Sequence, residues 1–378
     1  MRHAPGPRLN DACTQNTTMN EDKRHGEARR IASNTVWLLA GQIIRLGSVF
    51  LAVAWTARYL GPEEFGVYSY AIAFVLLFAE LGTLGLQGII THDLVEDPAN
   101  DRTILGTAFV LRLCGAAATI AILTLLVYTV RLPDPRARWL ILVFAAGYLF
   151  RPLYVVNQFY ESRVEGKFPV IAASLASATL VGLTAVLIAQ AAPLGWFVAA
   201  RAVLVALAGI LILAILTLHR PQTLRWRFDR GLAVRMLRRS WPLLASALTA
   251  TIYLKIDQVM LGGMSGSEDV GIYAAASQLS EVWYFLPILL MSSLFPSLIT
   301  LSQENKSTYH ERLSTIFGSM AWFGIAVAVG VTLFAGLLVN IFFGAGYDES
   351  TTVLRIHVWA LPFIFMRAAL SKWIIIEK

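Results

Sequence analysis

The chain of 378 residues is very apolar: hydrophobic residues make up 57% of it and charged residues only 15%. Soluble domains carry about 25% charged residues, so composition excludes a soluble protein and makes the lipid bilayer the expected solvent. The net charge of +7 could suggest nucleic acid. The basic residues lie in loops beside apolar segments, however, and this argues against a nucleic-acid partner.

The N-terminal segment is polar and basic. Residues 1–30 are expected to form a disordered cytoplasmic tail, without the short apolar core and cleavage site of a cleaved signal peptide. The two cysteines, Cys13 and Cys114, have no spacing that supports a metal site or a disulfide between them. No metal and no cofactor are expected.

The rest of the chain predicts an all-α, polytopic membrane protein. At about 20 apolar residues per span, about ten transmembrane helices are expected. They cover residues 31–57, 65–91, 104–130, 138–160, 168–190, 195–218, 240–263, 271–300, 315–343 and 351–376. Pro152 should kink the fourth helix, and Pro287 and Pro296 the eighth.

Loop charge predicts the orientation. With a cytoplasmic N-terminus, most basic loop residues fall on the inner side, including the arginine-rich segment 219–239. This segment is expected to be a linker that rests on anionic headgroups. The loops near residues 61–65 and 264–270 would then face outward, in a multi-pass protein of the bacterial inner membrane.

A duplicated phrase divides the chain into two halves. Residues 61–68 read GPEEFGVY and residues 266–273 read GSEDVGIY, a constant offset of 205, and each copy lies in the turn between two apolar stretches. Internal repeats of this size are typical of transporters whose path runs between the halves. A six-helix bundle is expected over residues 31–218. The second bundle, residues 240–378, contains only four predicted helices and is expected to be truncated.

Charged residues inside apolar spans mark candidate functional positions, because each costs about 2.5–3.5 kcal/mol at a helix centre. They are Arg45, Glu80, Arg112, Arg151, Arg201, Lys255, Asp257, Glu281, His357 and Arg367. Arg112 and Arg201 lie near span ends and are expected to snorkel to headgroups. His357 is expected to be a satisfied interfacial side chain.

Two interpretations remain for the deeper cations Arg45, Arg151, Arg367 and Lys255. Each could pair with a buried acid such as Glu80, Asp257 or Glu281. Alternatively, the cations could line a wet cavity and bind an anion with several oxygens, such as a diphosphate, which arginine holds bidentately. Glu80, Asp257 and Glu281 could also couple transport to an ion.

Lys255 and Asp257 are separated by about 200° on one helix. Asp257 is therefore expected to have the interior or ion-coupling role, while Lys255 would reach toward the outer interface. The chain has no phosphate-binding Gly-Lys-Ser/Thr loop and no His-Glu-x-x-His motif. No long outer loop offers a catalytic domain, so an enzyme is not expected.

Two segments carry a resemblance to a known family. Residues 57–68, ARYLGPEEFGVY, closely resemble the first outer turn of bacterial O-antigen and polysaccharide flippases. Residues 256–262, IDQVMLG, and the following VGIY are similar to that family's seventh-helix signature. This family is the polysaccharide-transporter branch of the multidrug/oligosaccharidyl-lipid/polysaccharide exporter superfamily. Its members usually have more helices than the ten predicted here.

The resemblance implies a transporter that flips an undecaprenyl-diphosphate-linked oligosaccharide across the inner membrane for polysaccharide or O-antigen biosynthesis. Its partners would be that lipid-linked oligosaccharide, membrane lipids, a proton or sodium counter-ion, and polysaccharide assembly proteins. The alternative is a multidrug or lipid-precursor exporter of the same superfamily. A membrane glycosyltransferase, polymerase or ligase, or a membrane scaffold, fits the sequence less well.

Overall fold

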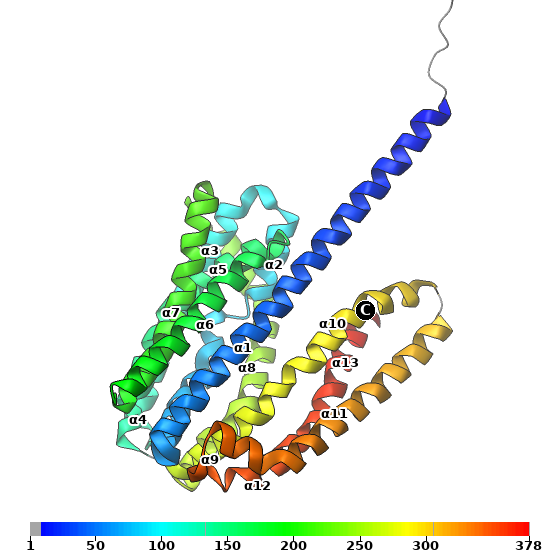
Figure 1. Cartoon of the computed structure of the whole chain (residues 1–378). Helices are drawn as coiled ribbons and strands as arrows, with labels where there is room; N and C mark the ends of the chain where they lie inside the picture. Colours follow the sequence, from blue (N-terminus) through cyan, green and yellow to red (C-terminus); the bar gives the residue numbers. More distant parts are fainter. Residues whose placement is uncertain (1–8, 133, 305, 378) are drawn as a thin grey trace, which may run out of the picture.

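The computed structural model describes residues 9–132, 134–304 and 306–377, and these are helical with short connections and no β-strand (Figure 1). The predicted all-α class is thereby confirmed. The N-terminal elements are α1 (Leu9–Thr83), α2 (Gln87–Glu96), η1 (Pro98–Asn100), α3 (Asp101–Thr129), α4 (Pro135–Gly147), η2 (Tyr148–Tyr154), α5 (Val155–Ser162), α6 (Lys167–Ala189), α7 (Leu194–His219) and η3 (Pro221–Leu224). The C-terminal elements are α8 (Arg230–Met264), α9 (Ser267–Glu281), η4 (Val282–Tyr284), α10 (Phe285–Glu304), α11 (Lys306–Phe342), η5 (Ala345–Tyr347), α12 (Ser350–His357), η6 (Val358–Ala360) and α13 (Leu361–Glu377).

Eight helical stretches of the described residues are long and apolar enough to cross a membrane. One of them, Ala40–Glu96, holds the first two predicted spans, and α8 is not among the eight. A count of about ten spans therefore remains approximate. Large apolar side chains such as Leu125, Trp322 and Leu333 are exposed on the outside, where lipid would cover them.

Glycines with positive φ form the turns between spans. Gly61 (φ 76°, ψ 170°) divides α1 into two helices, and Gly266 (φ 98°, ψ −178°) precedes α9. Gly344 (φ 89°, ψ −178°) has the same conformation before η5. Side chains disfavour this region of φ, so the backbone explains why both copies of the duplicated phrase begin with glycine.

Other helix boundaries differ from the predicted ones. Residues 9–30, expected to be disordered, are part of α1, since no proline follows Pro7 until Pro62. Pro152 lies in the 3-10 segment η2, which interrupts the fourth span as predicted. The eighth span breaks at η4, just before Pro287, whereas α10 continues through Pro296. Helix α8 begins at Arg230, inside the segment expected to be a linker.

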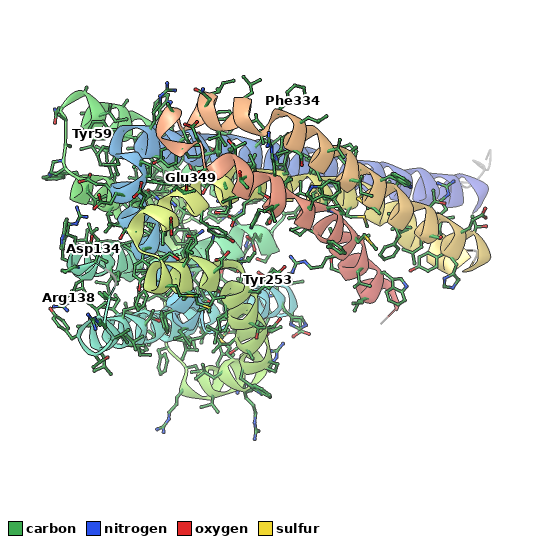
Figure 2. All side chains as sticks on the ribbon, turned by 90° about the horizontal axis from the view of Figure 1, so that it is seen from below. Tyr59, Asp134, Arg138, Tyr253, Phe334 and Glu349 are labelled. Atoms are coloured by element: carbon green, nitrogen blue, oxygen red, sulfur yellow. The ribbon has the colours of Figure 1, made fainter. Side chains whose placement is uncertain are left out.

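The helices form two groups that meet at one end. In Figure 1 the N-terminal bundle α2–α7 stands at the left, and α10, α11 and α13 form a second group at the right. The groups meet at the bottom, where α9 and α12 lie, and they diverge toward the top. We call the bottom the glycine-turn end, because Gly61, Gly266 and Gly344 lie there. Figure 2 views the molecule from this end, with Tyr59 and Asp134 on the N-terminal side and Glu349 on the C-terminal side.

Candidate transport site

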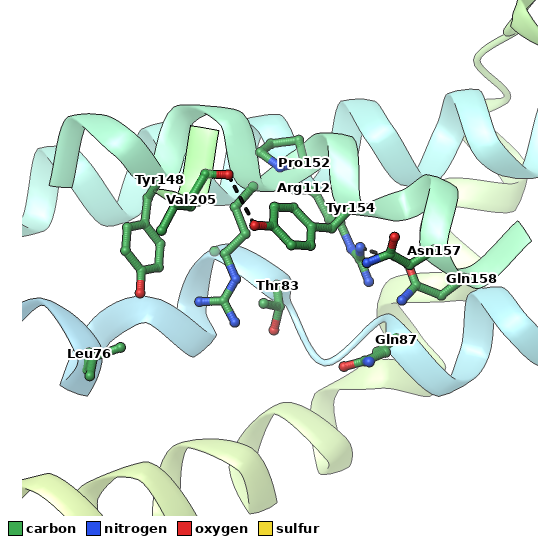
Figure 3. Close-up of a pocket in the computed structure, with 12 residues that line it drawn as sticks. Leu76, Thr83, Gln87, Arg112, Tyr148, Pro152, Tyr154, Asn157, Gln158 and Val205 are labelled. Atoms are coloured by element: carbon green, nitrogen blue, oxygen red, sulfur yellow. Dashed lines mark hydrogen bonds between the residues drawn. The ribbon is translucent and has the colours of Figure 1, made fainter. Parts of the chain in front are cut away.

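A polar pocket of about 310 Å³ lies inside the N-terminal bundle (Figure 3). It is surrounded by the end of α1 and by α2, α3, η2, α5 and α7. Its lining residues are Leu76, Gly82, Thr83, Gln87, Arg112, Tyr148, Arg151, Pro152, Tyr154, Asn157, Gln158 and Val205. The pocket therefore holds two arginines among amide, hydroxyl and aromatic side chains.

Arg112 is the most buried of the candidate cations, with 5% of its surface exposed. It lies on the face of α3 that also buries Ala108 and Thr119. Its Nη1 donates a hydrogen bond of 3.0 Å to Oε1 of Gln158, drawn in Figure 3, while its Nε has no hydrogen-bond partner. Within the described residues Arg112 forms no ion pair, so it leaves a positive charge in the pocket.

Arg151 is neutralised by an acid of α1. Its Nη2 lies 3.2 Å from Oε1 of Glu80, and its guanidinium lies 5.1 Å from the centre of the Tyr148 ring. The hydroxyl of Thr83 donates to Oε2 of Glu80 at 2.9 Å. The bend at Pro152 sets Arg151 in η2 rather than in a regular helix.

Arg45 lies close to this group. Its Nη2 donates a 2.8 Å hydrogen bond to Oε1 of Gln42, one turn away on the same helix. Tyr154 is within electrostatic range of both Arg45 and Arg151, and its hydroxyl donates to the carbonyl oxygen of Val205 at 3.0 Å. The N-terminal bundle thus holds Arg45 and Arg112, each hydrogen-bonded to a neutral amide, and the ion pair of Arg151 with Glu80.

A second polar group lies in the C-terminal bundle. Lys255 Nζ lies 3.0 and 3.2 Å from the two carboxylate oxygens of Glu281. Two residues after Lys255 on α8, Asp257 accepts a hydrogen bond from the hydroxyl of Tyr273. The His357 ring lies edge-on to Tyr273 at 5.9 Å, and its buried Nδ1 has no partner.

A second cavity, of about 200 Å³, lies where the two halves meet. Residues Phe65, Tyr68 and Ser69 of α1 line it, as do Lys255 and Gln258 of α8 and Gln278 and Glu281 of α9. Arg201 of α7 also lines it, and its buried Nε and Nη1 have no hydrogen-bond partner. Lys255 is paired with Glu281. The positive charge in this cavity that has no ion-pair partner among the described residues is therefore that of Arg201.

The predicted cations are therefore divided among several places. Arg45 and Arg151 lie in the N-terminal bundle, whereas Arg367 lies exposed on α13 in the other group of helices. Arg151 and Lys255 follow the ion-pair interpretation. Lys255 contacts Glu281 rather than the outer interface. Both Lys255 and Asp257 bond to side chains of α9, so the angular separation along α8 did not send Lys255 away from the interior.

Three residues that sequence reasoning had discounted face the interior. Arg112 and Arg201, expected to snorkel to headgroups, line the first and the second cavity respectively. His357 lies beside Tyr273 and is not satisfied at Nδ1. The helix face was the missing signal: Arg201 follows the buried Phe197 and Val198 by one turn, on the side of α7 that packs inward.

Comparison with known proteins matches residues 31–302 to a family model described as polysaccharide biosynthesis protein. A protein of Shigella flexneri named "Putative O-antigen transporter" is 24% identical over 360 residues, 92% of this chain and 84% of that protein. A protein of the same name from Escherichia coli (strain K12) is 22% identical over 344 residues, 88% of this chain and 80% of that protein.

Solved structures share the fold. The lipid II flippase MurJ in an inward closed conformation has a TM-score of 0.69 at 15% identity, with 91% of this chain and 76% of that chain covered. An inward-facing multidrug resistance MATE family transporter of the MOP superfamily has a TM-score of 0.63 at 15% identity, with 91% of this chain and 87% of that chain covered. At these identities the likeness concerns the arrangement of helices alone.

Proposed function

Because the chain belongs to the polysaccharide biosynthesis protein family, we propose that it flips an undecaprenyl-diphosphate-linked oligosaccharide across the bacterial inner membrane. The O-antigen transporter names of its relatives and the flippase and exporter folds of its structural neighbours support a transporter of lipid-linked saccharides. The membrane helices support a multi-pass membrane protein. The named relatives are transporters or flippases, and no catalytic role is proposed.

The observation that carries this proposal is the unneutralised guanidinium of Arg201 in the cavity between the halves. A cation without a protein partner in a low-dielectric site favours an anionic ligand. We assign the diphosphate to this cavity, held by Arg201 and by Lys255, whose partner Glu281 would be displaced in part. The saccharide would follow the diphosphate, while the lipid tail stays in the bilayer.

The N-terminal cations supply further positive charge. Arg45, Arg112 and Arg151 outnumber Glu80 in their bundle, and a headgroup that enters between the halves would pass this field. Arg367, exposed on α13, would face the same path from the C-terminal group once the halves close on the cargo.

We propose that the glycine-turn end faces the periplasm and that the N-terminus is cytoplasmic. The basic residues of segment 219–239 support this orientation. Transport would then proceed by rocking of the two halves between inward-open and outward-open forms, coupled to a proton or sodium ion. Asp257 is the proposed coupling residue, because it is an acid without a cationic partner in its bundle among the described residues.

The cargo and the direction can be tested together. Deletion of the gene should cause lipid-linked glycan to accumulate on the cytoplasmic face of the membrane, and this chain should reverse the accumulation. Export of unrelated cationic dyes without any effect on lipid-linked glycan would favour a multidrug exporter instead. Accumulation of the bare lipid carrier or of unelongated saccharide would favour a glycosyltransferase or polymerase.

A further inference from the structure

The two copies of the duplicated phrase touch each other at the glycine-turn end. A β-carbon added to Gly66 would lie 1.6 Å from the carbonyl oxygen of Ser267, and one added to Gly271 would lie 2.0 Å from the carbonyl oxygen of Pro62. Gly66 and Gly271 are equivalent positions in the repeat, and so are Pro62 and Ser267. The contact is therefore reciprocal, as a local two-fold axis between the halves would produce.

Both contacts are made to backbone atoms. A side chain could rotate away from an added methyl group, but a carbonyl group in the first turn of a helix moves only with its helix. Ordinary van der Waals contact begins at 3.4 Å, so a methyl at Gly66 would require the two helices to separate by about 1.8 Å. Close approach of two backbones is a position where glycine alone fits.

The surroundings make this contact a seal between the two halves. Phe65, next to Gly66, is 1% exposed, and its ring packs against Phe343 and Tyr347 of the C-terminal half. The hydroxyl of Tyr347 donates a 2.7 Å hydrogen bond to the carbonyl oxygen of Ala57. Arg58 donates to the carbonyl oxygen of Ile341 at 3.2 Å.

The seal lies directly beside the cavity between the halves. On α1 the cavity is lined by Phe65, which precedes Gly66, and by Tyr68 and Ser69, which follow it. On α9 it is lined by Ala274 and Gln278, which follow Gly271. The contact at Gly66 and Gly271 therefore stands between the cavity and the solvent at the glycine-turn end, while the helices diverge at the other end (Figure 1).

We propose that Gly66 and Gly271 form a reciprocal glycine clasp that closes this end of the transporter, and that the clasp must open for the cavity to reach the solvent there. A methyl group on either glycine holds the halves apart and shifts the protein toward the form open at this end. The clasp acts on the conformation and does not depend on which cargo is carried.

The test is the accessibility of the cavity. Ser69 is 8% exposed, and a Ser69→Cys reporter, in a background where Cys13 and Cys114 are replaced by serine, would be labelled with a membrane-impermeant maleimide. A Glu64→Cys marker in the first turn identifies the side on which the glycine-turn end lies. Labelling in intact cells and in inverted vesicles measures access of the maleimide from each side of the membrane. An error in the proposed orientation therefore does not affect the result.

Gly66→Ala and Gly271→Ala should each raise labelling of the reporter from the glycine-turn side by about tenfold, the ratio that a bias of roughly 1.4 kcal/mol between two states produces. The double variant should add little, because one methyl already opens the clasp. Gly263→Ala is the matched control, since its added β-carbon meets nothing within 4 Å, and it should leave labelling unchanged.

Two results would overturn the clasp. One is unchanged reporter labelling in both alanine variants, each present in the membrane at the level of the parent protein. The other is failure of both alanine variants to accumulate while Gly263→Ala accumulates normally, since the contact would then be a requirement for folding and not a gate.

Discussion

The N-terminal and C-terminal polar groups differ in the sign of the charged side chains that form no ion pair. Each contains one ion pair, Arg151 with Glu80 and Lys255 with Glu281. Beyond the pair, the N-terminal group holds Arg45 and Arg112, each bonded to a neutral amide, and the C-terminal group holds Asp257, bonded to a hydroxyl. The N-terminal group is therefore left with surplus cations and the C-terminal group with a surplus acid.

This asymmetry shows that a duplicated chain need not duplicate its chemistry. The two turns share positive-φ glycines at Gly61 and Gly266 and close backbone contacts at Gly66 and Gly271, both at the constant offset. The membrane-embedded charges did not keep equivalent positions, and each half can serve a different ligand. A surplus cation suits an anionic cargo, and a surplus acid suits a transported cation.

The largest expected effect comes from leaving one of the paired acids alone. Arg151→Ala should lower the free energy of unfolding by roughly 1–3 kcal/mol, because Glu80, whose side chain is 26% exposed, would lose its ion-pair partner. Lys255→Ala should cost a similar amount, since Glu281 would lose its ion-pair partner. Thermal unfolding in detergent, followed with the yield of monodisperse protein, measures both changes.

The double variant Glu80→Gln with Arg151→Gln is the control for that comparison. It removes both charges, so it should recover most of the lost stability. A double variant as unstable as Arg151→Ala would mean that Arg151 acts through its packing on Tyr148 and not through its charge.

Loss of a surplus cation should reduce transport without loss of protein. Arg201→Gln and Arg112→Gln should each lower transport per molecule about tenfold or more, as expected when a hydrogen bond to a charged group, worth roughly 1.5–3 kcal/mol, is removed. Lysine at either position should restore only part of the transport rate, because lysine cannot form the two parallel hydrogen bonds that an arginine guanidinium donates. The measurement is lipid-linked glycan flipped, normalised to membrane protein.

Arg238 provides the matched control, since it is exposed on α8 and lines neither of the two cavities. Arg238→Gln changes the net charge equally and should leave transport unchanged. Equal losses in Arg238→Gln and Arg201→Gln would show that total charge matters and the cavity position does not.

The surplus acid should affect coupling more than folding. Asp257→Asn should make the transport rate insensitive to an imposed proton or sodium gradient, with normal protein levels, because the asparagine still accepts the hydrogen bond from Tyr273. Tyr273→Phe should retain a response to the gradient. Transport in proteoliposomes with and without each gradient measures this, and a full gradient response in Asp257→Asn would exclude this residue as the coupling acid.

The smallest effect is expected at Asp134, outside the spans. This aspartate caps α4 by accepting from the backbone N–H of Arg136 at 2.6 Å, and it accepts from the Arg136 guanidinium at 2.8 Å. Partial burial alone would raise the pKa of Asp134, but the hydrogen bonds from Arg136 outweigh it and lower the pKa. Asp134→Ala should cost about 1 kcal/mol at neutral pH.

The pH dependence follows from that lowered pKa. The contribution of Asp134 is fully present above its unfolded pKa of about 3.9, and it is lost as the pH falls through the lower folded value. The difference in unfolding temperature between the parent and Asp134→Ala should therefore shrink below about pH 4. Asp134→Asn keeps the cap but not the charge, so the difference in unfolding temperature between Asp134→Asn and Asp134→Ala should not vary as a titration of residue 134.

The sequence predicted the fold class and the break at Pro152, since these follow from hydrophobicity and from proline. It left open whether the deep cations pair with acids or line a cavity, and only Arg151 and Lys255 form ion pairs among them in the described residues. Arg112 and Arg201 were misplaced because depth along a span was weighed without the helix face. On α3, Arg112 lies three and four residues before the buried Gly115 and Ala116, a spacing that points inward. The reciprocal contact of Gly66 and Gly271 joins residues far apart in the chain, so only the folded arrangement reveals it.

Helix α8 connects the two halves as one continuous helix. Its first turns belong to the N-terminal half, where Arg239 lies 2.7 Å from Asp93 and Met236 is buried. Its later turns belong to the other half through Lys255. The halves are thus joined by a stiff lever and not by a slack tether. Relative rotation must bend that lever, and Pro242, which cannot donate a backbone hydrogen bond to the carbonyl of Arg238, is where it yields most readily.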